Sequence, residues 1–108
     1  MGFNITENSY RGIPVLLLEG SLMDTDALRF SRALRNLIKN GHPQVGVDIS
    51  RLEYIDSHGL GLLVYHSNTL KKEKRSLIIF NSNTDPDSYI NKLISSTNLH
   101  VALTILPN

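Results

Sequence analysis

The amino-acid sequence predicts one α/β domain, spanning residues 1–108, with a mostly parallel mixed sheet. Three observations support this prediction. Apolar runs of strand length alternate with segments of helical period, in the order β-β-α-β-α-β-α-β. Strands joined through helices pair in parallel by right-handed crossovers, so only the first two strands, which a short turn connects, should be antiparallel. With 41% hydrophobic and 19% charged residues, the chain also has the composition of a globular domain.

The first two strands are predicted to form a hairpin. Phe3 and Ile5 alternate with polar residues, which is typical of an edge strand, and residues 10–12 (Tyr-Arg-Gly) supply the turn. Residues 13–18 form a nearly unbroken apolar run, as expected of a strand that is covered on both faces. Gly20 is expected to end this second strand.

Residues 24–39 have the period of a helix. Asp24, Thr25 or Asp26 can cap its start, and Gly41 can take the left-handed position after its end. One face is apolar: Ala27, Phe30, Ala33, Leu34, Leu37 and Ile38. The opposite face is basic: Arg29, Arg32, Arg35 and Lys39. We interpret this basic row as the solvated back of an amphipathic helix rather than as a phosphate-binding stripe.

The middle of the chain predicts two covered strands and a second helix. Residues 45–49 form the third strand, and a polar crossing leads to a helix from Ser57 to about Lys72. Residues 77–80 form the fourth strand. The inward positions of the helix are Leu60, Leu63, Val64 and Leu70.

The last part of the chain predicts a short helix and a final strand. Asp85 can cap a helix that has Pro86 at its first position and runs to about Ser96. Asn98 suits the left-handed position that follows. Residues 101–106 predict the fifth strand.

The composition excludes several kinds of site and partner. The chain has no cysteine, which excludes disulfides, thiolate metal sites and thiol catalysis. A net charge of +1 argues against a nucleic-acid partner. No apolar run approaches the roughly 20 residues that a membrane span needs, and no signal peptide is recognisable, so we expect a cytoplasmic protein.

The four histidines are scattered along the chain. None pairs with another at the i, i+4 spacing of a helical zinc site. We therefore expect ordinary surface or loop histidines, no metal site and no cofactor. These histidines are His42, His58, His66 and His100.

The sequence Asp56-Ser57 stands at the start of a helix that contains two glycines. We expect Ser57 at the N-cap, where its oxygen accepts a bond from an early helical N–H group, and where the helix dipole favours a phosphate. Gly59 and Gly61 each cost about 1 kcal/mol of helix propensity relative to alanine. This cost indicates that the neighbouring strands, or a partner, approach the helix closely. We predict a phosphorylation switch on Ser57.

Two other interpretations of the same residues stay open. Asp-Ser at a helix start is also what any capped helix shows. Serine, histidine and aspartate are the residue types of a hydrolase triad as well. Adjacent residues at a helix start point in different directions, however, and no G-x-S-x-G pattern is present, so no catalytic residue is predicted.

Three short segments are similar to those of one known family. They are residues 20–22 (GSL), residues 47–50 (VDIS) and, most specifically, residues 54–63 (YIDSHGLGLL). Through these segments and the order of its elements, nearly the whole chain resembles the STAS domain of bacterial anti-sigma factor antagonists.

The resemblance implies a mechanism of partner switching. The serine that matches Ser57 is phosphorylated by the cognate anti-sigma factor, a serine kinase that itself holds the ATP. The unphosphorylated protein binds that kinase and frees the sigma factor, whereas the phosphorylated protein releases the kinase. A metal-dependent serine phosphatase resets the cycle. The resemblance thus implies transcription regulation in a stress response, by a protein that is not an enzyme.

The resemblance also implies a partner-binding surface around Ser57. It comprises Asp56, His58, Gly59, Leu60, Met23 and Asp24. Two of its positions depart from the family pattern. The family often has aspartate where Met23 stands, so the acidic contact is lost or moves to Asp24. The family commonly has a small residue in place of His58, and this histidine can steady a phosphoserine or narrow the choice of kinase.

A second role within the same family is a fixed scaffold. The chain would then be a subunit of a stress-sensing assembly or of a lipid-transport ATPase complex, and the same helix face would dock a permanent partner.

Overall fold

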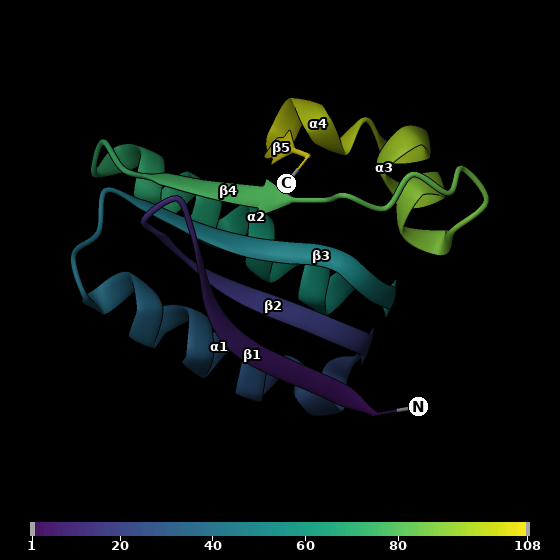
Figure 1. The fold of residues 1–108 in the computed structure, drawn as a ribbon, viewed down its shortest axis with the longest axis horizontal. Coiled ribbons are helices and arrows are strands. Elements are labelled where there is room, and N and C mark those ends of the chain that lie inside the picture. The colour runs from purple at the N-terminus through teal and green to yellow at the C-terminus, as the bar shows by residue number, and fades with distance from the viewer. Residues whose placement is uncertain (1, 108) are drawn as a thin grey trace.

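One five-stranded sheet organises the chain (Figure 1). The computed structural model describes residues 2–107; residues 1 and 108, which the predicted domain includes, lie outside the described range. The elements are β1 (Phe3–Tyr10), β2 (Ile13–Leu22), α1 (Asp24–Lys39), β3 (Gln44–Ile55), α2 (Ser57–Lys72), β4 (Ser76–Phe80), α3 (Tyr89–Thr97), α4 (Leu99–Ala102) and β5 (Thr104–Leu106).

The strands lie in the order β1-β2-β3-β4-β5. β1 and β2 are antiparallel, and the three other pairs are parallel, so the predicted fold class is confirmed. The described chain has one more helix than predicted, the single turn α4. None of the helices within residues 2–107 is both long and apolar enough to cross a membrane.

The helices cover one face of the sheet. In Figure 1, α1 and α2 lie behind the strands, and α3 and α4 lie along the upper edge. The main core fills the space between these layers, where Leu18 and Val47 of the sheet are buried with Phe30 of α1 and Leu63 of α2. The amphipathic face predicted for α1 is confirmed, because its buried residues include Ala27 and most of the predicted apolar row.

Two strands are longer than predicted. β2 continues through Gly20 to Leu22, because Gly20 takes a φ of +90° at an irregularity in the pairing with β3. β3 continues beyond residue 49 to Ile55, where a polar crossing was expected. Leu52 and Ile55 are buried, so this polar-looking segment still contributes to the core.

Two helices begin differently from the prediction. Met23 occupies the N-cap of α1, and no side chain caps this helix. α3 begins at Tyr89 rather than at Pro86, because the Asp85 carboxylate closes a turn by accepting from the N–H of Asp87. The cap of α3 is Ser88, whose Oγ accepts from the N–H of Asn91 at 3.1 Å.

The end of the chain differs from the predicted strand over residues 101–106. Asn98 takes the expected left-handed conformation, with φ of +50°, but α4 follows it directly. In a strand, Val101 would share a face with Leu99 and Leu103, but Val101 is 79% exposed whereas both leucines are buried, so this segment does not follow the alternation of a strand. β5 is therefore limited to Thr104–Leu106.

The prediction that every histidine lies at the surface or in a loop is wrong for His66. This residue of α2 is 7% exposed, and its Nε2 atom has no hydrogen-bond partner among the described residues. The ring packs edge-on against Tyr65 at 5.1 Å. Burial lowers the pKa of His66 below its ordinary value of 6.5, and the positive charge of Arg35 on α1 lowers it further.

The buried His66 predicts a loss of stability in mild acid. Below pH 6.5 the unfolded chain binds a proton that the folded chain does not yet bind, so the free energy of unfolding should fall as the pH drops. Urea unfolding between about pH 7.5 and pH 5 measures this dependence. His66→Gln should flatten the curve, whereas His42→Gln, at an exposed position, should not. Equal slopes for His66→Gln and the unchanged protein would contradict the assignment.

Candidate functional site

Asp56 connects the end of β3 to the start of α2. Its N–H donates to the carbonyl of Leu22 at 3.1 Å, which ties it to the end of β2. Its Oδ1 accepts from the N–H of Gly59 at 2.9 Å, and its carbonyl accepts the first helical bond, from Leu60, at 3.0 Å. Asp56 is therefore the N-cap of α2. The prediction that Ser57 is this cap is wrong by one residue.

Ser57 occupies the first helical position and is exposed. Its hydroxyl does not cap the helix, because the carboxylate of Asp56 accepts the capping hydrogen bond from the N–H of Gly59. The backbone N–H groups of Ser57 and His58 find no acceptor among the described residues, as is usual for the first turn of a helix. The positive end of the helix dipole is thus open beside the serine oxygen.

The two glycines of α2 have different surroundings. A Cβ atom at Gly59 would lie 3.0 Å from side-chain atoms of Leu22 and Ile55, so the neighbouring strands pack directly against this position. A Cβ atom at Gly61 would meet nothing within 4 Å. The close approach that the glycines predict is therefore made at Gly59 by strands of the same chain. At Gly61 no described atom lies close to the helix, and its surface is open.

His58 joins the starts of the two large helices. Its Nδ1 atom lies 2.9 Å from Oδ1 of Asp24 in α1, and both side chains are more than half exposed. The structure therefore brings His58 and Asp24, which are far apart in the sequence, together beside Ser57. When His58 is protonated, this contact is an ion pair.

A shallow hollow of about 300 Å³ lies next to the cap. It is lined by Met23, Asp24, Thr25, Tyr54 and Asp56. Met23 is 47% exposed at the N-cap of α1. The loop between β2 and α1 thus presents an apolar side chain and a carboxylate beside Ser57.

Two tyrosines attach α3 to this region, which the sequence reasoning missed. The rings of Tyr54 and Tyr89 lie 4.7 Å apart, and the hydroxyl of Tyr89 donates to the carbonyl of Ile55 at 3.3 Å. Partial burial raises the pKa of Tyr89, and the neighbouring Tyr54 and Asp56 raise it further. The one signal in the sequence that could have linked Tyr54 to the site is its position in the segment 54–63, which carries the resemblance to the STAS domain.

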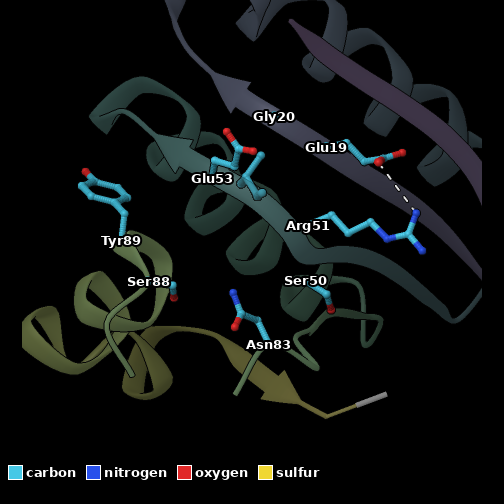
Figure 2. A pocket seen from close by; sticks show the side chains of 9 residues that line it. Glu19, Gly20, Ser50, Arg51, Glu53, Asn83, Ser88 and Tyr89 are labelled. Atoms are coloured by element: carbon cyan, nitrogen blue, oxygen red, sulfur yellow. Dashed lines mark ion pairs between the residues drawn. The ribbon is translucent and has the colours of Figure 1, made fainter. Parts of the chain in front are cut away.

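A larger polar pocket of about 550 Å³ lies across the ends of β2 and β3 (Figure 2). Figure 2 shows Arg51 reaching toward Glu19, at 3.7 Å, with Glu53 and Tyr89 on the other side of the pocket. One guanidinium and two carboxylates give this lining no preference for an anion. Ser57 does not line it, so we do not place a phosphate there.

The residue types of a hydrolase triad are present but do not form one. Asp56 is engaged with the N–H of Gly59, and the His58 ring is directed to Asp24. No contact between Ser57 and a histidine occurs among the described residues, so the serine lacks a general base. Within residues 2–107, no group of three or more potential ligands could hold a metal ion.

Comparison with known proteins identifies the family. The family model described as "Mlab, STAS domain" matches residues 5–101. The chain belongs to the STAS domain family. The predicted resemblance is confirmed, and membership of this family agrees with a binding protein rather than an enzyme. No curated protein matches the chain in sequence.

Solved structures of other proteins share the fold at low sequence identity. An anti-sigma factor antagonist from Mycobacterium paratuberculosis is 16% identical, with a TM-score of 0.77 over 99% of this chain and 87% of its own. The anti-sigma factor antagonist SpoIIAA in its unphosphorylated form is 18% identical, with a TM-score of 0.67 over 97% and 87%. The Bacillus cell fate determinant SpoIIAA in its phosphorylated form is 18% identical, with a TM-score of 0.67 over 99% of this chain and 91% of its own.

The surroundings of the two glycines predict opposite effects of alanine. Gly61→Ala should raise the free energy of unfolding by about 0.5–1 kcal/mol, because an exposed helical position gains propensity without a clash. Gly59→Ala should lower it by about 1 kcal/mol, because overpacking against Leu22 and Ile55 outweighs the same gain. Urea unfolding of both variants provides the measurement. Equal stabilisation by the two alanines would show that the strands do not constrain Gly59.

Proposed function

We propose that the chain is an anti-sigma factor antagonist that is switched by phosphorylation of Ser57. The observation that carries this proposal is the exposure of Ser57 at the first position of α2, with its hydroxyl uninvolved in the cap. Membership of the STAS family and the shared fold with SpoIIAA, solved in phosphorylated and unphosphorylated forms, support it.

In this proposal the partner is an anti-sigma factor that is also a serine kinase. The kinase holds the ATP and transfers the terminal phosphoryl group of this ATP to Ser57 Oγ, so the bond to the β-phosphate breaks, ADP leaves and the hydroxyl proton is released. The unphosphorylated chain binds the kinase, so the sigma factor is free. A metal-dependent serine phosphatase removes the phosphate again. The STAS chain supplies an accessible hydroxyl and a docking surface, and it requires no cofactor of its own.

The energetics of the switch follow from local charge. A phosphoserine adds a charge of about −1.5 to −2 directly beside Asp56. The open N–H groups of Ser57 and His58 and the helix dipole stabilise this charge within the free chain. A partner that packs against a neutral serine would instead bury two adjacent anions, at a cost of several kcal/mol. Binding is therefore lost without a change of fold.

The docking surface in this proposal consists of the exposed side chains around Ser57. Met23 and Asp24 flank it from α1, and His58 and Gly61 extend it along α2. Tyr65, one helical turn beyond Gly61 and 62% exposed, continues this surface. Of the predicted contact residues, Gly59 is buried and packs against the strands, Leu60 is half-buried, and Asp56 acts mainly through its cap.

A fixed scaffold role is the second candidate. The same open helix face, with no side chain at Gly61, would then dock a permanent subunit of a stress-sensing assembly or of a lipid-transport ATPase complex. Stable co-purification with a transporter ATPase or a high-mass assembly, independent of the phosphorylation of Ser57, would favour this role.

Substitutions at Ser57 test the charge mechanism. Ser57→Ala should bind the cognate kinase constitutively, and Ser57→Asp should bind about 100-fold more weakly, because a carboxylate would be buried without a counter-charge. Ser57→Asn is the matched neutral control and should retain most of the affinity. Isothermal titration calorimetry with the purified kinase measures all three. Equal affinity of Ser57→Asp and Ser57→Asn would contradict exclusion by charge.

A pair of charge substitutions tests the docking surface. Met23→Lys should weaken kinase binding about tenfold, because it replaces an apolar side chain of the surface with a positive charge beside Asp24. Val101→Lys is the matched control, because Val101 is 79% exposed on α4, outside the surface. The same titration compares them. If both variants bound like the unchanged protein, the surface would have to lie elsewhere.

A further inference from the structure

The sheet has a second face that the helices do not cover. Figure 1 shows this face turned toward the viewer, with α1 and α2 behind it. It carries its own small apolar cluster, in which Val15, Ile78 and Phe80 are buried and Tyr10 and Ile13 pack against them. This cluster is separate from the main core, so its side chains need a different explanation from helix packing.

A hollow of about 510 Å³ lies on this face. At Gly46, β3 has no side chain, and the Phe80 ring and the Val15 side chain fill this space. A Cβ atom at Gly46 would lie 2.7 Å from Phe80 and 2.9 Å from Val15. The hairpin turn and the end of β5 flank the hollow. Its lining is Tyr10, Arg11, Ile13, Gln44, Ile78, Phe80, Leu106 and Pro107. Its volume lies within the range of about 300–1,000 Å³ that is typical of small-molecule sites.

The lining combines an apolar wall with two donors. Arg11 is the only charged residue among those lining the hollow, and the carboxamide of Gln44 is a second donor. Arg11 sits in the turn with φ of +52°, and no described residue forms an ion pair or hydrogen bond with its side chain. The buried carboxylate of this face, Asp48, does not line the hollow and already accepts from the hydroxyl of Tyr10 at 2.6 Å.

We propose that this hollow binds a small amphipathic carboxylate, of the class of medium-chain fatty acids. Its carboxylate would accept hydrogen bonds from Arg11 and Gln44, and its hydrocarbon chain would lie against Ile78, Phe80 and Leu106. A guanidinium that faces no acidic side chain in the lining selects an anion, and the apolar wall selects an aliphatic body. This site is independent of Ser57, which belongs to the helix side of the sheet.

Octanoate is the probe for this proposal, and 1-octanol is its uncharged control. The ¹⁵N-labelled full chain is titrated with each while amide chemical shifts are recorded. Octanoate should shift the amides of Arg11, Ile13, Ile78 and Phe80 and leave those at the start of α2 unchanged. 1-Octanol should bind at the same residues about tenfold more weakly, because it lacks the charge-assisted contact. Shifts scattered over the surface, or none, would overturn the proposal.

Two variants distinguish the proposed contact between Arg11 and the carboxylate from nonspecific binding. Arg11→Gln should weaken octanoate binding about tenfold and leave 1-octanol binding unchanged. Arg51→Gln removes another exposed arginine, outside the hollow, and should leave both affinities unchanged. Amide spectra of both variants show directly whether the fold is kept. If Arg11→Gln bound octanoate as tightly as the unchanged chain, the hollow would not be an anion site.

Discussion

The site depends on the capping of α2 by Asp56. One carboxylate oxygen of Asp56 accepts a hydrogen bond from the N–H of Gly59, and the N–H of Asp56 donates to the carbonyl of Leu22. These two bonds fix the start of α2 against the ends of β2 and β3. They also leave the next residue, Ser57, in the first helical position with its hydroxyl outside the cap. The absence of a side chain at Gly59 permits this close contact, since a Cβ there would press on Leu22 and Ile55.

This arrangement separates the structural role of Asp56 from the regulatory role that we propose for Ser57. If Ser57 itself were the cap, esterification of its oxygen would remove the bond that begins the helix. With Asp56 as the cap, Ser57 can carry a phosphate while α2 stays intact, and the open N–H groups of the first turn are available to the new charge. A switch that acts by exclusion of a partner requires this independence. The contact between His58 and Asp24 adds a polar link between α1 and α2 at the same place.

Sequence reasoning succeeded where the hydrophobic period was long and failed where single residues decided. The bounds of α1 followed from sixteen residues of amphipathic pattern. Those of α2 followed from the Asp56-Ser57 start signal and four inward apolar positions. The end of β3 was missed because an irregularity in its pairing changes the spacing of its buried residues. The cap was misplaced because aspartate and serine are almost equally good N-caps, and the bond that joins Asp56 to Leu22 of the neighbouring strand is not visible in the sequence. The proximity of His58 to Asp24, and of Tyr54 to Tyr89, depends on tertiary structure that no local pattern contains.

We propose that Ser57 is the residue at which a phosphate is added and removed. The decisive experiment is intact-mass spectrometry of the natively purified protein, followed by peptide mapping and phosphatase treatment. We expect a subpopulation of the protein that is heavier by one phosphate group, mapped to Ser57 and converted to the lighter form by a metal-dependent serine phosphatase. A phosphate that maps to another residue, with Ser57 unmodified, would contradict it.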